Sequence, residues 1–150
     1  MPGLDSSTAS HPTRKLEVLA IYKQESDCTA LRAIMMHTNW ALHCVPDLQQ
    51  ALQFLEKHAV PVIVCPRDLG EDGWKDVIGA VAHFRSPPNV VVYTEHADDA
   101  FWMDVLHSGG YDILLKPFNR DEVFRLLSLA WRKWNDDVKQ LNRLHHRKNA

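Results

Sequence analysis

Short hydrophobic runs alternate along the chain with segments whose apolar residues recur at helical spacing. The runs, bounded by turn residues, predict strands at residues 16–21, 41–45, 60–65, 90–93 and 113–115. The periodic segments predict helices at residues 28–36, 48–55, 74–84 and 98–107, and a long final helix from residue 121. Strands that alternate with helices, and whose central runs are apolar throughout, indicate a parallel sheet covered by helices on both faces.

Residues at the predicted helix starts support this division. Ser26 and Asp27 are placed to cap the first helix, and Asp47 is placed to cap the second. Asn119 followed by Glu122 forms a capping box that opens the last helix.

The chain divides into three segments. Residues 1–14 consist largely of turn residues with little to bury, so we expect a flexible leader there. Residues 15–131 contain all five strand–helix pairs and form the expected domain. Residues 132–150 continue the last helix and end in a basic tail.

Composition and charge exclude several classes of function. Seventeen Lys and Arg against nineteen Asp and Glu produce no overall positive field, which argues against nucleic-acid binding as the main task. The apolar runs are far shorter than the ~20 residues of a membrane span, and the N-terminus does not resemble a signal peptide. The three cysteines, Cys28, Cys44 and Cys65, follow no motif spacing and suggest reduced thiols. We therefore expect a cytoplasmic protein without membrane contact.

Candidate functional residues lie just after the predicted strands, because ligands of open parallel sheets bind at the carboxyl ends of the strands. The most specific motif is Gly-Gly-Tyr-Asp-Ile-Leu-Leu-Lys-Pro-Phe at residues 109–118. Thr94 closes the fourth strand fifteen positions before Gly109, and residues 61–74 join the third strand to an acidic, glycine-containing loop.

Together and in this order, these three features resemble the receiver domain of bacterial two-component response regulators. The resemblance covers residues 16–131. It implies a flavodoxin-like, doubly wound α/β fold with five parallel strands in the order 2-1-3-4-5 and helices on both faces.

The resemblance also implies a chemistry. In that family an aspartate at the end of the third strand accepts a phosphoryl group from a histidine kinase, and acids after the first strand hold Mg²⁺. A hydroxyl and a lysine contact the phosphoryl oxygens, and an aromatic residue on the fifth strand acts as a switch. Thr94 and Lys116 occupy the two phosphoryl-contact positions.

The reacting positions depart from the family pattern. Pro66 stands at the phosphoacceptor position and supplies no nucleophilic oxygen. Tyr22 and Lys23 replace the metal-binding acids, and Ile113 replaces the switch aromatic. We therefore expect a stand-alone, atypical receiver domain in phosphorelay signalling. It is predicted to be non-enzymatic, to need no cofactor and to act by contact with a signalling protein or a histidine kinase system.

Two alternatives remain open. Asp68 could serve as a displaced phosphoacceptor, with Mg²⁺ held by Glu25 or Asp27, although these acids also suit a solvated loop and a helix start. The crevice at the strand ends could instead bind a small ligand. In the absence of a phosphoryl group we expect Lys116 to pair with an acid from the loops, namely Asp68, Asp72 or Glu95.

Large apolar side chains on the last two helices form a candidate interface. In the last helix they recur at intervals of three and four residues well past the end of the domain. The candidate interface consists of Phe101, Trp102, Trp131, Trp134, Val138 and Leu141. The last helix either folds back on its own domain or pairs with another chain, and we expect a homo-oligomer through this helix.

Overall fold

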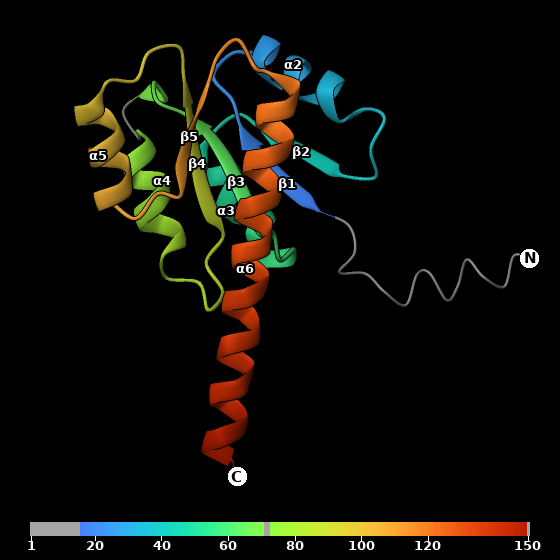
Figure 1. Cartoon of the computed structure of the whole chain (residues 1–150), viewed down its shortest axis with the longest axis vertical. Coiled ribbons are helices and arrows are strands. Elements are labelled where there is room, and N and C mark those ends of the chain that lie inside the picture. The colour runs from blue at the N-terminus through green and yellow to red at the C-terminus, as the bar shows by residue number, and fades with distance from the viewer. Residues whose placement is uncertain (1–15, 71–72, 150) are drawn as a thin grey trace, which may run out of the picture.

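The computed structural model describes residues 16–70 and 73–149, with side chains in the last helix as far as residue 144. The leader expected at residues 1–14 lies outside the described residues. The elements are β1 (Glu17–Ile21), α2 (Glu25–Met35), β2 (Ala41–Val45), α3 (Leu48–Lys57), β3 (Val62–Pro66), α4 (Trp74–Val81), β4 (Asn89–Thr94), α5 (Asp99–His107), β5 (Asp112–Leu115) and α6 (Arg120–Asn149) (Figure 1).

The five strands form one parallel sheet in the order β2-β1-β3-β4-β5. This order confirms the predicted flavodoxin-like arrangement. The chain moves outward from β1 to β2, returns to β3 on the other side of β1, and continues to β5. The order reverses at β1 and β3, so their carboxyl ends define the place where a doubly wound sheet presents its site.

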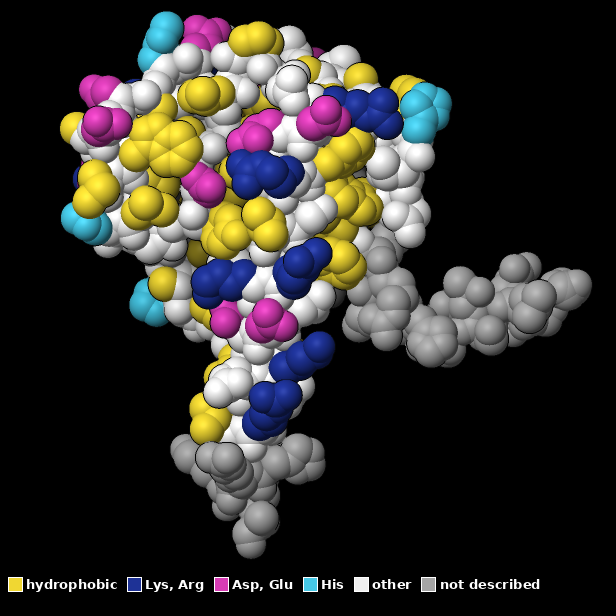
Figure 2. Space-filling view, in the orientation of Figure 1, with side chains coloured by type: hydrophobic (Ala, Val, Ile, Leu, Met, Phe, Trp, Pro, Cys, Tyr) yellow, Lys and Arg dark blue, Asp and Glu magenta, His cyan; other side chains and the backbone are white. Residues whose placement is uncertain are grey.

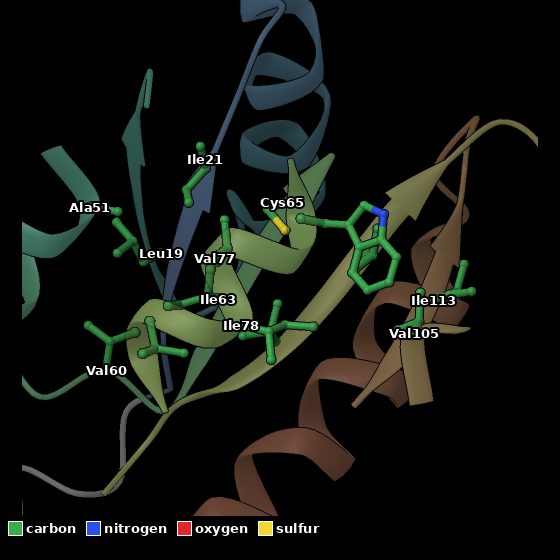
Figure 3. Close-up of a cluster of buried hydrophobic side chains, with 14 of the residues drawn as sticks. Leu19, Ile21, Ala51, Val60, Ile63, Cys65, Val77, Ile78, Val105 and Ile113 are labelled. Atoms are coloured by element: carbon green, nitrogen blue, oxygen red, sulfur yellow. The ribbon is translucent and has the colours of Figure 1, made fainter. Parts of the chain in front are cut away.

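Two hydrophobic clusters hold helices on the two faces of the sheet. Along β1, Val18 and Ala20 contribute to one cluster, and Leu19 and Ile21 contribute to the other. Helices α2 and α6 cover the first face, and α3, α4 and α5 cover the second, part of which Figure 3 shows. Since each fully buried Val, Leu or Ile contributes about 1.5–3 kcal/mol, the buried strands account for much of the folding free energy.

The start of the first helix differs from the prediction. The N-cap of α2 is Gln24, whose side chain makes no capping hydrogen bond, and Ser26 and Asp27 lie within the first turn. The acids Glu25 and Asp27 stabilise this turn through the helix dipole, so the helix begins without a capping side chain. The capping role predicted for Ser26 and Asp27 is therefore wrong.

The predicted caps of α3 and α6 are confirmed. Asp47 accepts a hydrogen bond from the backbone N–H of Gln50 at 2.8 Å, and Asn119 accepts one from Glu122 at 3.0 Å. The Glu122 carboxylate accepts two hydrogen bonds from Arg125, one turn further along the helix, and does not complete the capping box.

The last helix extends well beyond the sheet (Figure 1). Trp134 in this extension donates a hydrogen bond from Nε1 to the backbone oxygen of Ser86 at 3.2 Å. Val138 and Leu141 line a hollow of about 270 Å³ beside Pro87. The apolar seam of α6 therefore packs partly on its own domain. Among the described residues, no helix has both the length and the apolar character needed to cross a membrane.

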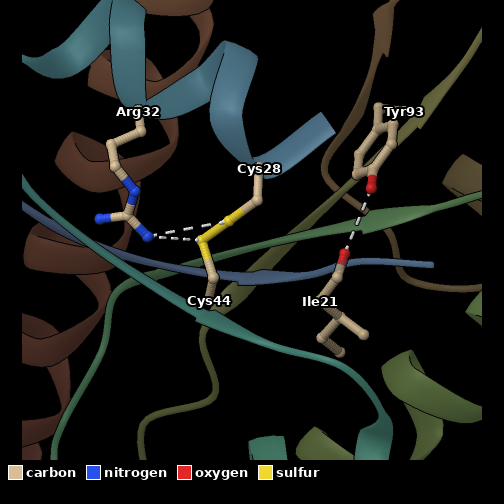
Figure 4. Close-up of a disulfide and its surroundings, with 5 residues drawn as sticks. All are labelled: Ile21, Cys28, Arg32, Cys44 and Tyr93. Carbon is tan, nitrogen blue, oxygen red and sulfur yellow. Dashed lines mark hydrogen bonds between the residues drawn. A yellow bond between two sulfur atoms is a disulfide. The ribbon is translucent and has the colours of Figure 1, made fainter. Parts of the chain in front are cut away.

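The cysteines differ from the expectation of three reduced thiols. Cys28 in α2 and Cys44 in β2 are joined by a disulfide, with their Cα atoms 6.6 Å apart (Figure 4). The two residues meet because α2 packs beside β2, a contact that their sequence spacing does not reveal. Cys65 is a free, buried thiol.

Candidate functional site

The carboxyl ends of β1, β3, β4 and β5 surround a cavity of about 370 Å³. Most of the side chains around it are charged or polar. The lining residues are Lys23, Gln24, Asp27, Pro66, Arg67, Asp68, Tyr93, Thr94, Glu95, His96 and Lys116. Most of the residues predicted to contribute to a site are therefore brought together here.

Pro66 is the last residue of β3 and lines this cavity. It is buried and pairs in register with Tyr93 of β4. The following residue, Arg67, donates its backbone N–H to the carbonyl of Tyr93 at 2.9 Å. The strand pairing thus continues past Pro66, and the position presents a pyrrolidine ring to the cavity.

Lys116 forms an ion pair with Asp27. Its Nζ atom lies 2.6 Å from Oδ1 of Asp27, and only 21% and 10% of the two side chains are exposed. Lys116 therefore pairs with Asp27, and the expected pairing with Asp68 or Glu95 is wrong. The reason is that the first turn of α2 directs the Asp27 carboxylate into the crevice, whereas Asp68 lies on the exposed loop.

The ring of Tyr93 lines the cavity next to this ion pair. Its centroid is 5.7 Å from Nζ of Lys116, and its hydroxyl donates to the backbone oxygen of Ile21 at 3.3 Å (Figure 4). Burial and, to a smaller extent, the negative charge of Asp27 raise the pKa of the Tyr93 phenol. Tyr93 therefore stays neutral and acts as a hydrogen-bond donor that ties β4 to the end of β1.

Lys23 and Asp68 form a second, exposed pair at the rim. Nζ of Lys23 lies 3.4 Å from Oδ2 of Asp68, whose side chain is 87% exposed. Such an exposed pair contributes little to stability because water screens it. Asp72 lies outside the described residues.

The loop after β4 is held by Thr94 and Arg67. The Thr94 hydroxyl donates to the carbonyl of His96 at 3.1 Å, and the Arg67 guanidinium donates to the same carbonyl at 3.0 Å. Arg67 also lies 3.9 Å above the ring of Phe101, in a cation–π contact. Phe101 is a buried core residue that packs against Trp74, which corrects its assignment to the interface.

Ile113, at the predicted switch position, points into the core. It is 2% exposed and belongs to the cluster beneath α3, α4 and α5. The remaining interface candidates, Trp102, Trp131, Trp134, Val138 and Leu141, are half-buried in the single chain.

Among the described residues, the donor set at the strand ends does not fit a magnesium ion. Mg²⁺ prefers an octahedral shell of oxygen ligands with one or two carboxylates. The positions after β1 carry a phenol and an ammonium, and the Asp27 carboxylate is already bound to Lys116. Within residues 16–70 and 73–149, no three His, Cys, Asp or Glu side chains are grouped so that they could hold a metal.

Sequence reasoning missed the roles of Tyr93 and Arg67. Tyr93 appeared only as the last residue of an apolar run, and Arg67 as part of a solvated loop. One signal was present: Tyr93 is the penultimate residue of β4, and Arg67 directly follows the neighbouring strand β3, at the strand ends where the cavity lies.

Comparisons with known proteins agree on one family. A family model described as the response regulator receiver domain matches residues 18–128. A two-component response regulator-like protein of Arabidopsis thaliana, APRR3, is 22% identical over 126 residues, which cover 81% of this chain and 26% of that protein. The chain spans about a quarter of the length of the curated relatives it matches.

Solved structures show the same fold. The signal receiver domain of a LuxO repressor protein from Vibrio parahaemolyticus superposes with a TM-score of 0.74 at 19% identity, covering 83% of this chain and 95% of that one. The receiver domain of Ssk1 from Saccharomyces cerevisiae, solved with the histidine phosphotransfer protein Ypd1, matches at a TM-score of 0.68 and 16% identity. That match covers 76% of this chain and 87% of that one.

Proposed function

Because the chain belongs to the response regulator receiver domain family, we propose that it acts in two-component signalling by contact with a partner protein, without phosphorylation at the end of β3. In this proposal it is a non-enzymatic module that needs no cofactor. Its partner is a signalling protein or a component of a histidine kinase system. Nucleic acid and membrane play no part in the proposed function.

One observation carries the proposal: the ion pair between Lys116 and Asp27 in a crevice where β3 ends at Pro66. In phosphoryl transfer to a carboxylate, a cation must neutralise the charge that develops on the phosphoryl oxygens. Here the cation is neutralised by a carboxylate of the chain itself, and proline supplies no attacking oxygen. The ion pair therefore supports the proposal of a receiver domain in which Asp27, and not a phosphoryl group, binds Lys116.

The exposed apolar residues support a protein partner. Met103 and Leu106 of α5, Leu115 of β5 and Leu129 of α6 are 38–51% exposed. Figure 2 shows hydrophobic side chains gathered over these elements. An exposed apolar patch rimmed by charges is typical of a protein-binding surface. The yeast Ssk1 receiver, similar in fold, was solved in a complex with a protein of phosphotransfer signalling.

The test is the intact mass of the full chain after incubation with acetyl phosphate and Mg²⁺. We expect no phosphate adduct, because neither an acceptor nor a metal site of the family type is available. The control is the Asp68→Ala variant under the same conditions. A stoichiometric adduct on the wild-type chain that disappears in Asp68→Ala would replace our proposal with phosphorylation of Asp68.

A further inference from the structure

The cysteine pair that joins α2 to β2 lies outside the crevice described above. Cys28 is the fourth residue of α2 and is 7% exposed, whereas Cys44 is half-buried in β2. Strand β2 is at the edge of the sheet, so Cys44 has a strand neighbour on one side only. A small reagent can therefore approach Cys44 more readily than Cys28.

Arg32 lies beside both sulfur atoms. Its Nη2 atom is 3.3 Å from Sγ of Cys44 and 4.0 Å from Sγ of Cys28 (Figure 4). A guanidinium at this distance stabilises a thiolate over a thiol, and the thiolate is the form that attacks disulfides. The N-terminal end of α2 adds a further positive potential at Cys28.

Cys65 provides an internal contrast. It is buried in β3, and burial raises the pKa of its thiol to about 12. A thiol of this kind is unreactive at neutral pH. The chain thus carries two cysteines in a cationic environment that favours exchange and a third in an environment that opposes it.

We propose that Cys28 and Cys44 form a reversible redox site, activated by Arg32, that exchanges with low-molecular-weight disulfides such as oxidised glutathione. In the forward direction the Cys44 thiolate attacks one glutathione sulfur and releases the other glutathione as a thiolate. Cys28 then loses its proton and attacks Sγ of Cys44, which releases the second glutathione. The two cysteines are oxidised by two electrons, one oxidised glutathione becomes two reduced molecules, and the released protons pass to the leaving thiolates.

The bond acts on the crevice through the first turn of α2. Cys28 directly follows Asp27, whose carboxylate binds Lys116. Cys44 is in register with Ala20 of β1, next to Ile21, the residue that accepts the Tyr93 hydroxyl bond. Oxidation therefore restrains the turn that holds the ion pair, and reduction releases this restraint.

The experiment follows thiol content in the full chain. The chain is reduced, desalted, exposed to oxidised glutathione at neutral pH, and then denatured and alkylated before intact-mass measurement. We expect one alkylated cysteine and a protein that has lost two hydrogens. The alkylated residue should be Cys65, the thiol outside the pair. Three alkylated cysteines, or glutathione attached to Cys65, would overturn the proposal.

Matched variants separate the roles of the residues. Cys65→Ser should oxidise like the wild type, and Cys28→Ser should retain one glutathione on Cys44. Arg32→Gln should slow oxidation about three- to tenfold at neutral pH, with the deficit shrinking as pH rises and the thiol ionises unaided. Arg32→Lys should restore most of the rate. Equal rates in Arg32→Gln and wild type would contradict activation by Arg32.

A second measurement tests the link to the crevice. We expect the backbone amide signals of Asp27 and Lys116 to shift between the oxidised and reduced chains, and to do so equally in Cys65→Ser. An unchanged Lys116 signal would overturn the proposed link.

Discussion

The ammonium group of Lys116 contacts the carboxylate of Asp27 and lies 5.7 Å from the ring centre of Tyr93. Asp27→Asn keeps the shape of the side chain but leaves the ammonium, which is largely shielded from water, without a counter-charge. We expect this change to lower the free energy of unfolding by about 2 kcal/mol, within the range for a hydrogen bond to a charged group. Urea unfolding of wild type and variant measures the difference.

The exposed pair at the rim supplies the control for this prediction. Asp68→Asn breaks the contact with Lys23, and we expect a loss of about 0.5 kcal/mol at most, as for exposed ion pairs. Adding Lys116→Met to Asp27→Asn should recover part of the loss, because the uncompensated charge is then removed. Equal losses in Asp27→Asn and Asp68→Asn would show that the inner pair is no stronger than the outer one.

Asp112 is predicted to make stability depend on pH. It is the first residue of β5 and accepts a hydrogen bond from the N–H of Ile113 at 2.7 Å, while burial raises the pKa of its carboxyl group. The folded state therefore binds the proton more tightly than the unfolded state, and the charged form reduces stability at neutral pH. We expect Asp112→Asn to be more stable than wild type at neutral pH, with the difference fading as pH falls through the raised pKa.

The pKa of Glu122 is shifted in the opposite direction to that of Asp112. The hydrogen bonds from Arg125 lower the pKa of its carboxyl group, so its contribution to stability is present above the unfolded pKa and is lost as pH falls through the folded pKa. Glu122→Gln should therefore be less stable than wild type at neutral pH and equal to it in acid. Unfolding of both variants over a pH series checks the signs, and the same sign in both would contradict these assignments.

At the scale of elements, the packing of α6 on the rest of the domain depends on Trp134. Its indole is half-buried and donates to the carbonyl of Ser86, in the loop between α4 and β4. We expect Trp134→Ala to lower the free energy of unfolding by about 1–2 kcal/mol, because apolar burial and one hydrogen bond are lost. Urea unfolding measures this loss.

Two further variants in the same turn of α6 serve as comparisons for Trp134→Ala. Trp134→Phe keeps a six-membered aromatic ring but removes the N–H donor and the five-membered ring, so its loss sets an upper limit on the contribution of the hydrogen bond to Ser86. Arg132→Ala alters an exposed residue, and we expect a change within about 0.5 kcal/mol. If Trp134→Ala lowers the free energy of unfolding no more than Arg132→Ala does, the packing of this part of α6 on the domain does not contribute to stability.

At the scale of the whole molecule, the extension of α6 bears on assembly. Leu144 is 50% exposed, although Val138 and Leu141 are partly covered by the domain. We expect the chain to self-associate through this part of α6, since pairing would bury the remaining apolar surface. Light scattering on the full chain should report a mass above that of the monomer.

The interface on α6 can be tested without removing the helix. Leu144→Glu places a charge on the exposed seam and should reduce the measured mass to that of a monomer. Asn142→Glu introduces the same charge at an exposed position two residues before Leu144, on the other side of the helix, and should leave the oligomer intact. A wild-type chain with the mass of a monomer would contradict the prediction of self-association.

The sequence alone was sufficient for the order and type of the elements and for the sheet topology implied by the motif at residues 109–118. Local patterns encode these features: the apolar runs of β3 and β4 are buried on both faces, and Asp47 and Asn119 cap the helices they precede. The first residue of α2 and the ion-pair partner of Lys116 were less predictable. Several acids near these positions could equally well have capped the helix or paired with the lysine.

Only the tertiary structure decided which side chains meet at the strand ends and at the sheet edge. Lys116 bonds to Asp27, which comes from the opposite end of the domain sequence, and Cys28 meets Cys44. Both contacts depend on the rotation of α2 about its axis, which is set by the burial of Leu31 and Met35 against the sheet. Local sequence determines that α2 is a helix, but packing of its apolar face determines where Asp27 and Cys28 point.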